Sequence, residues 1–197
     1  MYPRAMSNRQ PVAGATYDEY LLREALSDVR HEYLRGDVHA MAGGTIEHGA
    51  VAAAFTGELH AALRGKPCRA FSSDVRVRVE ETDLTTYPDI SVVCGPLQTA
   101  AVDPNAITNP VVIVEVLSPN TEAYDRGAKA AHYRRLPSLR ELVLVSASER
   151  RVEVQRRTDS GAWELHEARA GEWAELASLG VTLEVDLFFA DPLPPRD

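Results

Sequence analysis

One short stretch, VVIVEVLSPN at residues 111–120, constrains the fold of this chain more than any other. Six of its first seven residues are valine, isoleucine or leucine, and a Ser-Pro-Asn breaker follows them. A run this short and this apolar predicts an interior strand that is covered on both of its faces. Glu115 stands in the middle of the run, where an ionised carboxylate is costly unless it is paired, metal-bound or solvated at a strand end. The stretch therefore predicts a covered sheet that carries a charged site.

The length of 197 residues fits one domain, which would bury about 70% of the surface of the unfolded chain. We predict a disordered tail at 1–15 and a single domain at 16–197. No apolar stretch approaches the roughly 20 residues of a membrane helix, so we expect no membrane partner. Cys68 and Cys94 show neither metal-ligand spacing nor a disulfide framework, so a reducing cytoplasm is the expected location.

Hydrophobic periodicity predicts a mixed α/β (α+β) fold, with a central sheet and helices on its faces. Helices are expected at 17–27, 46–63 and 122–135. Strands are expected at 31–41 (two short strands joined at Gly36-Asp37), 74–80, 87–95, 111–117, 141–147, 151–157, 162–168 and 180–185. Residues 103–109 are expected to form a loop, and Trp163 and Trp173 to fill the core.

A second acid, Asp89 in YPDISVV, also stands in a strand that is otherwise apolar. If its strand lies beside that of Glu115, the two carboxylates converge and repel each other. A divalent cation relieves this repulsion, and Mg²⁺ (or Mn²⁺) suits a site of one or two carboxylates, water and phosphate oxygens. The backbone carbonyl of Val116 is the expected third ligand, because the strand bends just after it.

Phosphodiester hydrolysis also needs a group that orients water and offsets negative charge in the transition state. Lys129 is the candidate, since it is one of two lysines in a chain with nineteen arginines. A lysine is a compact point charge whose pKa shifts readily. The alternative is a solvated pair with Asp125 four residues earlier, worth about 0.2–0.5 kcal/mol. In the functional interpretation, Asp125 instead orients Lys129.

The segments YPDISVVCG and NPVVIVEVLSPNTEAYDRGAKAAHYRRLPSLRELVLVSASERRVEVQRR resemble the bacterial Uma-two family. That family consists of predicted endonucleases of the restriction-endonuclease-like superfamily, whose signature is PD-(D/E)XK. The resemblance covers the chain from about residue 16. It implies that Pro88-Asp89 stands in the PD position, Glu115 in the acidic position, and Lys129 in the role of a lysine that has moved onto the following helix. The usual lysine position is occupied by Leu117.

The EHG triplet at 47–49 also resembles the family pattern. Glu47 is either a further carboxylate around the metal or a glutamate that favours the N-terminus of its helix, worth about 0.3–1 kcal/mol. We interpret His48 as a polar residue at a helix end rather than a ligand. Asp74 is interpreted as a cap or turn residue.

The net charge of −8 is unevenly distributed. Residues 126–157 hold nine Lys or Arg and three Glu, whereas 158–197 hold nine acids and two arginines. If the basic segment folds onto one face it suits a polyanion, so we expect DNA to be the substrate. The other interpretation is a scatter of solvated arginines. Two-fold symmetry is the commonest arrangement of oligomers, so a homodimer is expected.

These features together predict a Mg²⁺-dependent endonuclease that cleaves DNA. Two other functions remain compatible with the sequence. One is a non-catalytic protein on the same fold that binds nucleic acid or protein as a homo-oligomer. The other is a phosphoesterase that acts on small nucleotides and has no need of the basic segment.

Overall fold

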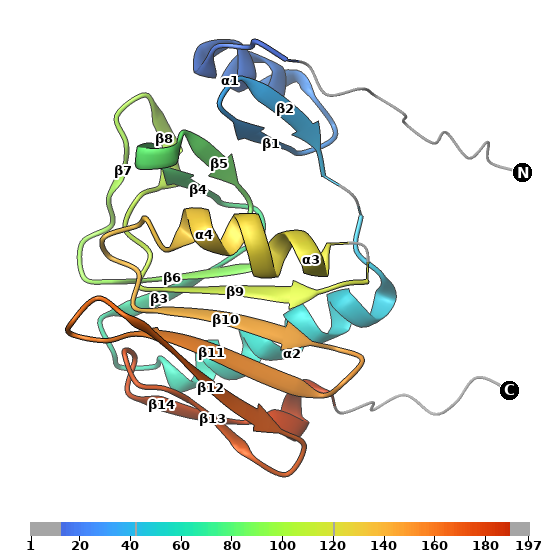
Figure 1. Ribbon diagram of the computed structural model, residues 1–197, viewed down its shortest axis with the longest axis vertical. Coiled ribbons are helices and arrows are strands. Elements are labelled where there is room, and N and C mark those ends of the chain that lie inside the picture. Colours follow the sequence, from blue (N-terminus) through green and yellow to red (C-terminus); the bar gives the residue numbers. More distant parts are fainter. Residues whose placement is uncertain (1–12, 42, 120, 190–197) are drawn as a thin grey trace, which may run out of the picture.

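The computed structural model describes residues 13–41, 43–119 and 121–189. Its central sheet has the strand order β12-β11-β10-β9-β6-β3, in which β9 and β10 are parallel and all other neighbours are antiparallel (Figure 1). The strands are β3 (Cys68–Ser72), β6 (Ile90–Cys94), β9 (Val112–Leu117), β10 (Glu141–Ser146), β11 (Arg151–Arg157) and β12 (Trp163–Arg169). The expected mixed α/β fold with a central mixed sheet is confirmed.

A second mixed sheet lies at the other end of the molecule, in the order β2-β1-β5-β4-β8-β7. Its strands are β1 (His31–Leu34), β2 (Asp37–Ala40), β4 (Arg76–Val79), β5 (Leu84–Thr86), β7 (Thr99–Ala100) and β8 (Asp103–Ile107), with the 3₁₀ turn η1 (Glu80–Thr82) between β4 and β5. Helix α1 (Tyr17–Leu26) begins with the capping box of Thr16 and Glu19. Tyr20 of α1 packs on Tyr33 and Val38 of the β1–β2 hairpin.

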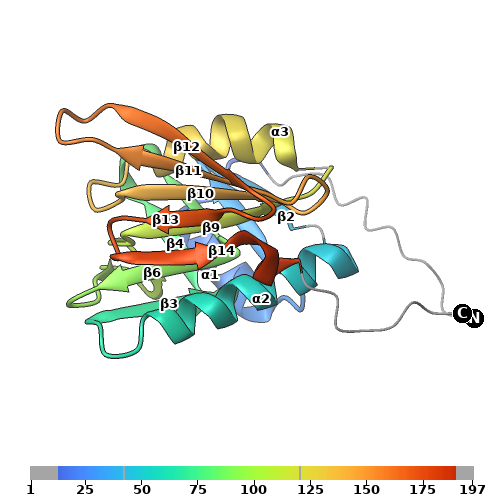
Figure 2. The same cartoon turned by 90° about the horizontal axis from the view of Figure 1, so that it is seen from below.

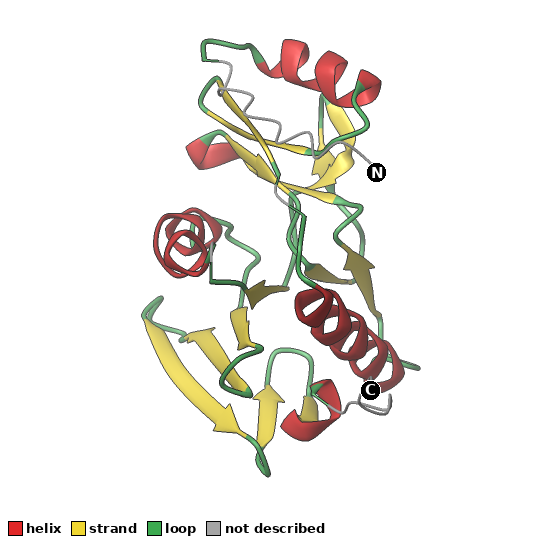
Figure 3. Ribbon diagram, turned by 90° about the vertical axis from the view of Figure 1, so that its right-hand side faces the viewer, coloured by secondary structure: helices red, strands yellow, loops and turns green. Residues whose placement is uncertain are grey.

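Helices cover both faces of the central sheet, as Figure 3 shows from the side. On one face lie helix α2 (Ile46–Ala62), the hairpin of β13 (Trp173–Leu176) and β14 (Val181–Glu184), and the 3₁₀ turn η3 (Val185–Phe188). Figure 2 shows α2 and this hairpin from below. On the other face lies one continuous helical segment, made of α3 (Glu122–Tyr124), a π-helical turn η2 (Asp125–Lys129) and α4 (Ala130–Tyr133).

The apolar run of β9 supplies two cores because its side chains alternate between the faces. Val112, Val114 and Val116 pack into the core under α2. Ile113 and Leu117 pack into the core under α4. All six residues of β9 are buried, and Glu115 points to the same side as Ile113 and Leu117. The interior strand is confirmed, and its one charge faces the helical segment of 122–133.

Two expectations about the core and the loops are wrong. Residues 103–107 form β8, which pairs in parallel with β4, instead of a loop. Trp173 is 59% exposed on β13, whereas Trp163 is partly buried against the core under α4. Most of the predicted tail, residues 1–12, lies outside the described residues.

No helix among the residues that the structure describes is long and apolar enough to cross a membrane.

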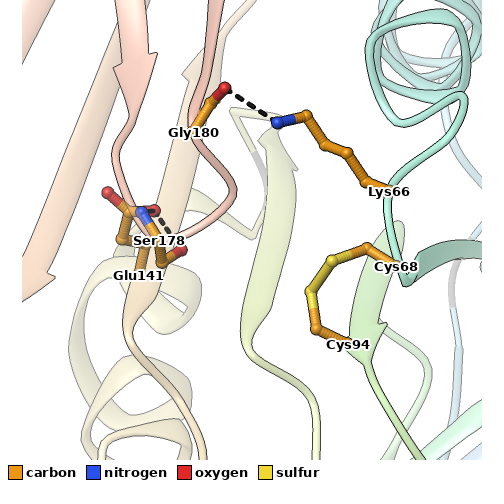
Figure 4. The surroundings of a disulfide bond; sticks show 6 residues. All are labelled: Lys66, Cys68, Cys94, Glu141, Ser178 and Gly180. Atoms are coloured by element: carbon orange, nitrogen blue, oxygen red, sulfur yellow. Dashed lines mark hydrogen bonds between the residues drawn. A yellow bond between two sulfur atoms is a disulfide. The ribbon is translucent and has the colours of Figure 1, made fainter.

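Cys68 and Cys94 form a disulfide, so the expectation that no disulfide is present is wrong (Figure 4). The antiparallel register of β3 and β6 places the two residues directly opposite each other. The spacing of 26 residues carries no sign of this register, which depends on how the two strands pair. The expectation of a reducing compartment was based on unpaired cysteines, and the disulfide removes that basis.

Candidate active site

Asp89 and Glu115 meet where β6 begins beside β9. The antiparallel register pairs Ile90 with Val114 and Ser91 with Ile113. Extending it by one residue places Asp89 opposite Glu115, a separation of about 5 Å between Cβ atoms in such pairs. The condition that the two acidic strands be neighbours is therefore met. Both carboxylates line one pocket of about 320 Å³.

Lys129 reaches this pocket from the helical segment that covers β9. Its Nζ lies 2.9 Å from Oε1 of Glu115, 3.3 Å from Oε1 of Glu32 and 3.6 Å from Oδ1 of Asp125. The side chain is only 6% exposed. Asp125 and Lys129 are the two ends of the π-helical turn, a rare conformation that often occurs at functional sites. Their pairing is thus part of a buried cluster, not a solvated helix face.

Burial and charge act in opposite directions on Lys129. Burial alone would lower the pKa of its ammonium, but Glu115, Tyr133, Glu32 and Asp125 together raise that pKa well above the ordinary value. Lys129 is therefore a permanent cation in this pocket. Burial raises the pKa of Glu115 to about 7, and the negative charges of Asp89 and Asp125 act in the same direction. The attraction of Lys129 and the hydrogen bond from Tyr133 lower this pKa and offset the rise only in part.

Asp89 is held through a single oxygen. Its Oδ2 accepts hydrogen bonds from the backbone N–H of Val116 at 2.7 Å and from Nε2 of His48 at 3.1 Å. The bond with Asp89 raises the pKa of His48, although partial burial opposes this. Gly44 leaves room for the imidazole, because a Cβ at this position would lie 2.8 Å from Nδ1 of His48.

Glu115 is also held through one oxygen. Its Oε1 accepts a hydrogen bond of 2.6 Å from the hydroxyl of Tyr133 and faces Lys129. Within the described part of the chain, no hydrogen bond reaches Oε2 of Glu115 or Oδ1 of Asp89. Each acid therefore keeps one oxygen for a ligand in the pocket. Val116 also lines the pocket, and its backbone N–H bonds to Asp89.

The pocket carries an excess of negative charge. Four carboxylates line it, from Glu32, Asp89, Glu115 and Asp125. When all four are ionised, the Lys129 ammonium and a protonated His48 leave two negative charges uncompensated. A divalent cation is the smallest ligand that would neutralise them.

The donor set determines which kind of metal fits. Among the described residues, no three side chains of the His, Cys, Asp and Glu types gather closely enough to enclose a metal by themselves. A cation here would be held by Asp89, Glu115, the carbonyl of Val116 and water. Mg²⁺ favours such sites because it keeps several waters and takes few carboxylates. The residues present fit Mg²⁺ or Mn²⁺.

The structure brings most of the sequence-predicted site residues together and leaves one outside. Asp89, Glu115, Val116, Asp125 and Lys129 all line the pocket. Glu47 does not line it: this residue is exposed in the first turn of α2 and bonds to the start of its own helix, which lowers the pKa of its carboxyl. Its position matches the helix-end interpretation.

Sequence reasoning missed three contributors to the site. Glu32 lies on β1 of the second sheet, between the buried His31 and Tyr33, and was not singled out. Tyr133 lies at the end of α4 and was not singled out either. His48 was interpreted as a helix-end residue, and only the packing of α2 beside β6 brings it to Asp89. No local pattern marks these three, because the contacts join elements far apart in the chain.

The chain matches known proteins over most of its length. A family model described as "Uma2: Putative restriction endonuclease" matches residues 17–187. Two proteins of Synechocystis sp. (strain ATCC 27184 / PCC 6803 / Kazusa) are similar in sequence. One, slr1290, is 34% identical over 94% of this chain and 96% of its own length, and the other, sll1609, is 30% identical over 82% and 90%.

A solved structure shares the fold. The crystal structure of "a putative nuclease belonging to DUF820" from Anabaena variabilis ATCC 29413 superposes with a TM-score of 0.70. The match covers 89% of this chain and 97% of that chain, at 20% sequence identity. At this identity the likeness concerns the fold.

Proposed function

The chain belongs to the Uma2 family, and from this premise we propose that it is a metal-dependent endonuclease that hydrolyses phosphodiester bonds of DNA. The observation that carries the proposal is the buried cluster in which Lys129 lies 2.9 Å from Glu115, beside Asp89. A cluster of acids and one lysine at a strand end is costly to bury, so its retention favours a catalytic use.

In the proposed site, Asp89 and Glu115 hold Mg²⁺ or Mn²⁺ through their free oxygens, together with the carbonyl of Val116. The bound cation supplies charge that neutralises the scissile phosphate and acidifies a bound water. His48 and the N–H of Val116 fix the orientation of the Asp89 carboxylate. Tyr133 does the same for Glu115, so both acids are preorganised before a ligand enters.

Lys129 acts as a charge and a hydrogen-bond donor rather than as a base. Its raised pKa keeps the ammonium protonated throughout the neutral range. An ammonium beside Glu115 can orient the attacking water and stabilise the negative charge that develops on the phosphate. Asp125 and Glu32 hold the ammonium in place from two other sides. The lysine at 129 thus takes the role that the usual motif gives to position 117.

Cleavage of supercoiled plasmid DNA in Mg²⁺ or Mn²⁺ tests the proposal. We expect the wild type to nick or cut the plasmid, and Asp89→Asn and Glu115→Gln to lose this activity on the order of a thousandfold or more, since each change replaces a charged carboxylate ligand by a neutral amide. Asp18→Asn removes the same charge from the exposed face of α1 and is the matched control.

Three outcomes are decisive. Cleavage by the wild type and by Asp18→Asn, lost in both site variants and in chelator, supports the proposal. Equal behaviour of all four proteins overturns it. Hydrolysis of small nucleotide phosphoesters in place of plasmid would assign the site to a phosphoesterase, which also overturns the endonuclease proposal.

A further inference from the structure

The basic segment 126–157 is mostly neutralised within the fold. Four of its arginines form ion pairs with carboxylates: Arg126, Arg135, Arg151 and Arg156. Lys129 is buried in the pocket. Among the described residues, no carboxylate lies within ion-pair distance of the remaining four, which are Arg134, Arg140, Arg150 and Arg157. The basic segment therefore does not offer nine free cations to a polyanion.

Two of the unpaired arginines lie beside one aromatic ring, and a third, Arg140, is hydrogen-bonded through its backbone to one of them. The guanidinium carbons of Arg134 and Arg157 lie 5.6 and 5.0 Å from the ring centroid of Trp163. Arg140 lies near enough to Arg157 to lower its pKa further, in addition to the larger effect of burial. We call Arg134, Arg140, Arg157 and Trp163 the arginine cluster. Like charges that are held together without an acid between them repel, and a bound anion relieves this repulsion.

Two of the three arginines in the arginine cluster are held by hydrogen bonds. Arg157 donates hydrogen bonds to the backbone carbonyls of Arg134, Leu136 and Pro137, which end the helical segment. Nη2 of Arg134 donates to Oε1 of Gln155 at 2.5 Å, while its buried Nε has no partner in the described residues. Arg140 is exposed. The guanidinium groups of Arg134 and Arg157 are thus oriented by neutral partners, and no carboxylate among the described residues offsets their charge.

The arginine cluster lies on the same face of the central sheet as the pocket. The pocket is lined by Glu115 and Val116, near the carboxyl end of β9. In Figure 1 the helical segment runs from that end of β9 back along the strand, and Arg134 directly follows α4. Lys129 and Arg134 are five residues apart, a rise of about 8 Å along a helix. Along the axis of a duplex, where each strand has one phosphate for roughly every 3.4 Å, a rise of this size corresponds to about two phosphates. The outward residues between them, at 127, 128 and 131, are small and uncharged.

We propose that the arginine cluster binds the phosphate backbone of a nucleic-acid strand a few nucleotides away from the bond held in the pocket. The inference rests on the proposed function for the identity of the ligand in the pocket. Its role would be positional, because phosphate contacts set the register of a nucleic acid without reading its sequence. Trp163 packs against the guanidinium groups of Arg134 and Arg157, so the arginine cluster presents mainly charge.

Binding of a fluorescently labelled DNA duplex in chelator, where no cleavage occurs, tests this inference over a series of salt concentrations. We expect Arg134→Glu and Arg140→Glu each to weaken binding on the order of tenfold at low salt. Each is also expected to reduce the slope of log affinity against log salt by about 1 for each lost phosphate contact. The control is Arg69→Glu, the same charge reversal at an exposed position on β3, at the opposite edge of the central sheet.

Arg140→Glu carries the greatest weight, because the Arg140 side chain makes no hydrogen bond within the described residues and its replacement leaves the packing intact. If Arg134→Glu and Arg140→Glu bind DNA as Arg69→Glu does, the inference is overturned, even where the wild type cleaves plasmid. If these variants lose binding while the wild type binds but never cleaves, the inference stands and the endonuclease proposal fails.

Discussion

Replacing Glu115 by glutamine should make the metal-free protein more stable at alkaline pH. Burial raises the pKa of this carboxyl from its ordinary 4.5 to about 7. Between these two values the folded protein holds a proton that the unfolded chain has lost. The folded state is therefore favoured at low pH, and this contribution disappears as the pH rises through about 7. Glutamine has the shape of the protonated acid and does not titrate.

The size of the effect follows from the shift. One pKa unit corresponds to about 1.4 kcal/mol, so the contribution of Glu115 that is lost between about pH 4.5 and 7 amounts to about 3 kcal/mol. The residue is only 4% exposed, so solvent screens little of this energy. We expect Glu115→Gln and the wild type to have similar free energies of unfolding near pH 5. Near pH 8 the variant should be more stable by up to about 3 kcal/mol.

Urea unfolding in the presence of chelator, at about pH 5 and about pH 8, measures this difference. Asp18→Asn is again the control, since it removes one carboxylate from an exposed helix position. A difference in unfolding free energy between Glu115→Gln and the wild type that is the same at both pH values would refute the reasoning. It would mean that ionising Glu115 costs no more free energy in the folded protein than in the unfolded chain.

Three other predictions concern the support of the site and of the fold. Gly44→Ala should displace His48 and weaken Mn²⁺ binding on the order of tenfold in calorimetric titration. Gly43→Ala is the control, because its Cβ would meet no atom within 4 Å, and it should bind Mn²⁺ as the wild type does. Equal affinities of the two variants would contradict this prediction. Glu141→Gln should lower the free energy of unfolding by about 3 kcal/mol, because the fully buried carboxylate accepts several hydrogen bonds (Figure 4). A loss of under about 1 kcal/mol in urea unfolding would be inconsistent with this prediction. Cys94→Ala should cost about 3 kcal/mol, since the disulfide closes a loop of 26 residues; unchanged stability relative to oxidised wild type would refute the estimate.

The fold could largely be predicted from local patterns. The run at 111–117 predicted an interior strand, and in β9 its apolar residues do divide between two cores. Helix starts followed from capping residues, as in the box of Thr16 and Glu19. The pattern failed for β8, because a five-residue strand with a proline and an asparagine has no alternation to recognise. The prediction that Trp173 fills the core was wrong, because a large apolar side chain does not by itself show whether its face of the hairpin is covered.

The candidate site could be predicted only where its residues broke a local pattern. Asp89 and Glu115 are acids in apolar strands, and Lys129 is a rare lysine in an arginine-rich chain, so each stood out. Glu32 and His48 did not, because an acid in a hairpin and a histidine at a helix start are ordinary residues there. Glu32 and His48 reach the site only when the second sheet and α2 pack against the central sheet. A local sequence pattern does not show such tertiary contacts.

The composition of the basic segment was the least reliable guide. A local excess of positive charge predicted a surface for a polyanion, but ion pairs with Glu81, Glu122, Glu153 and others neutralise four of its arginines. Counting charges along the chain cannot reveal these pairs, since most of them join separate elements. What remains is Arg150 and the small arginine cluster near Trp163.

The most direct test of the central claim, that Asp89 and Glu115 form a cation site, is calorimetric titration of the metal-free protein with Mn²⁺. Metal binding does not depend on finding a preferred nucleic-acid sequence. The account predicts saturable binding by the wild type that is abolished in Asp89→Ala and retained in Asp18→Asn. Equal binding by the wild type and Asp89→Ala, or no binding by any of the three, would contradict it.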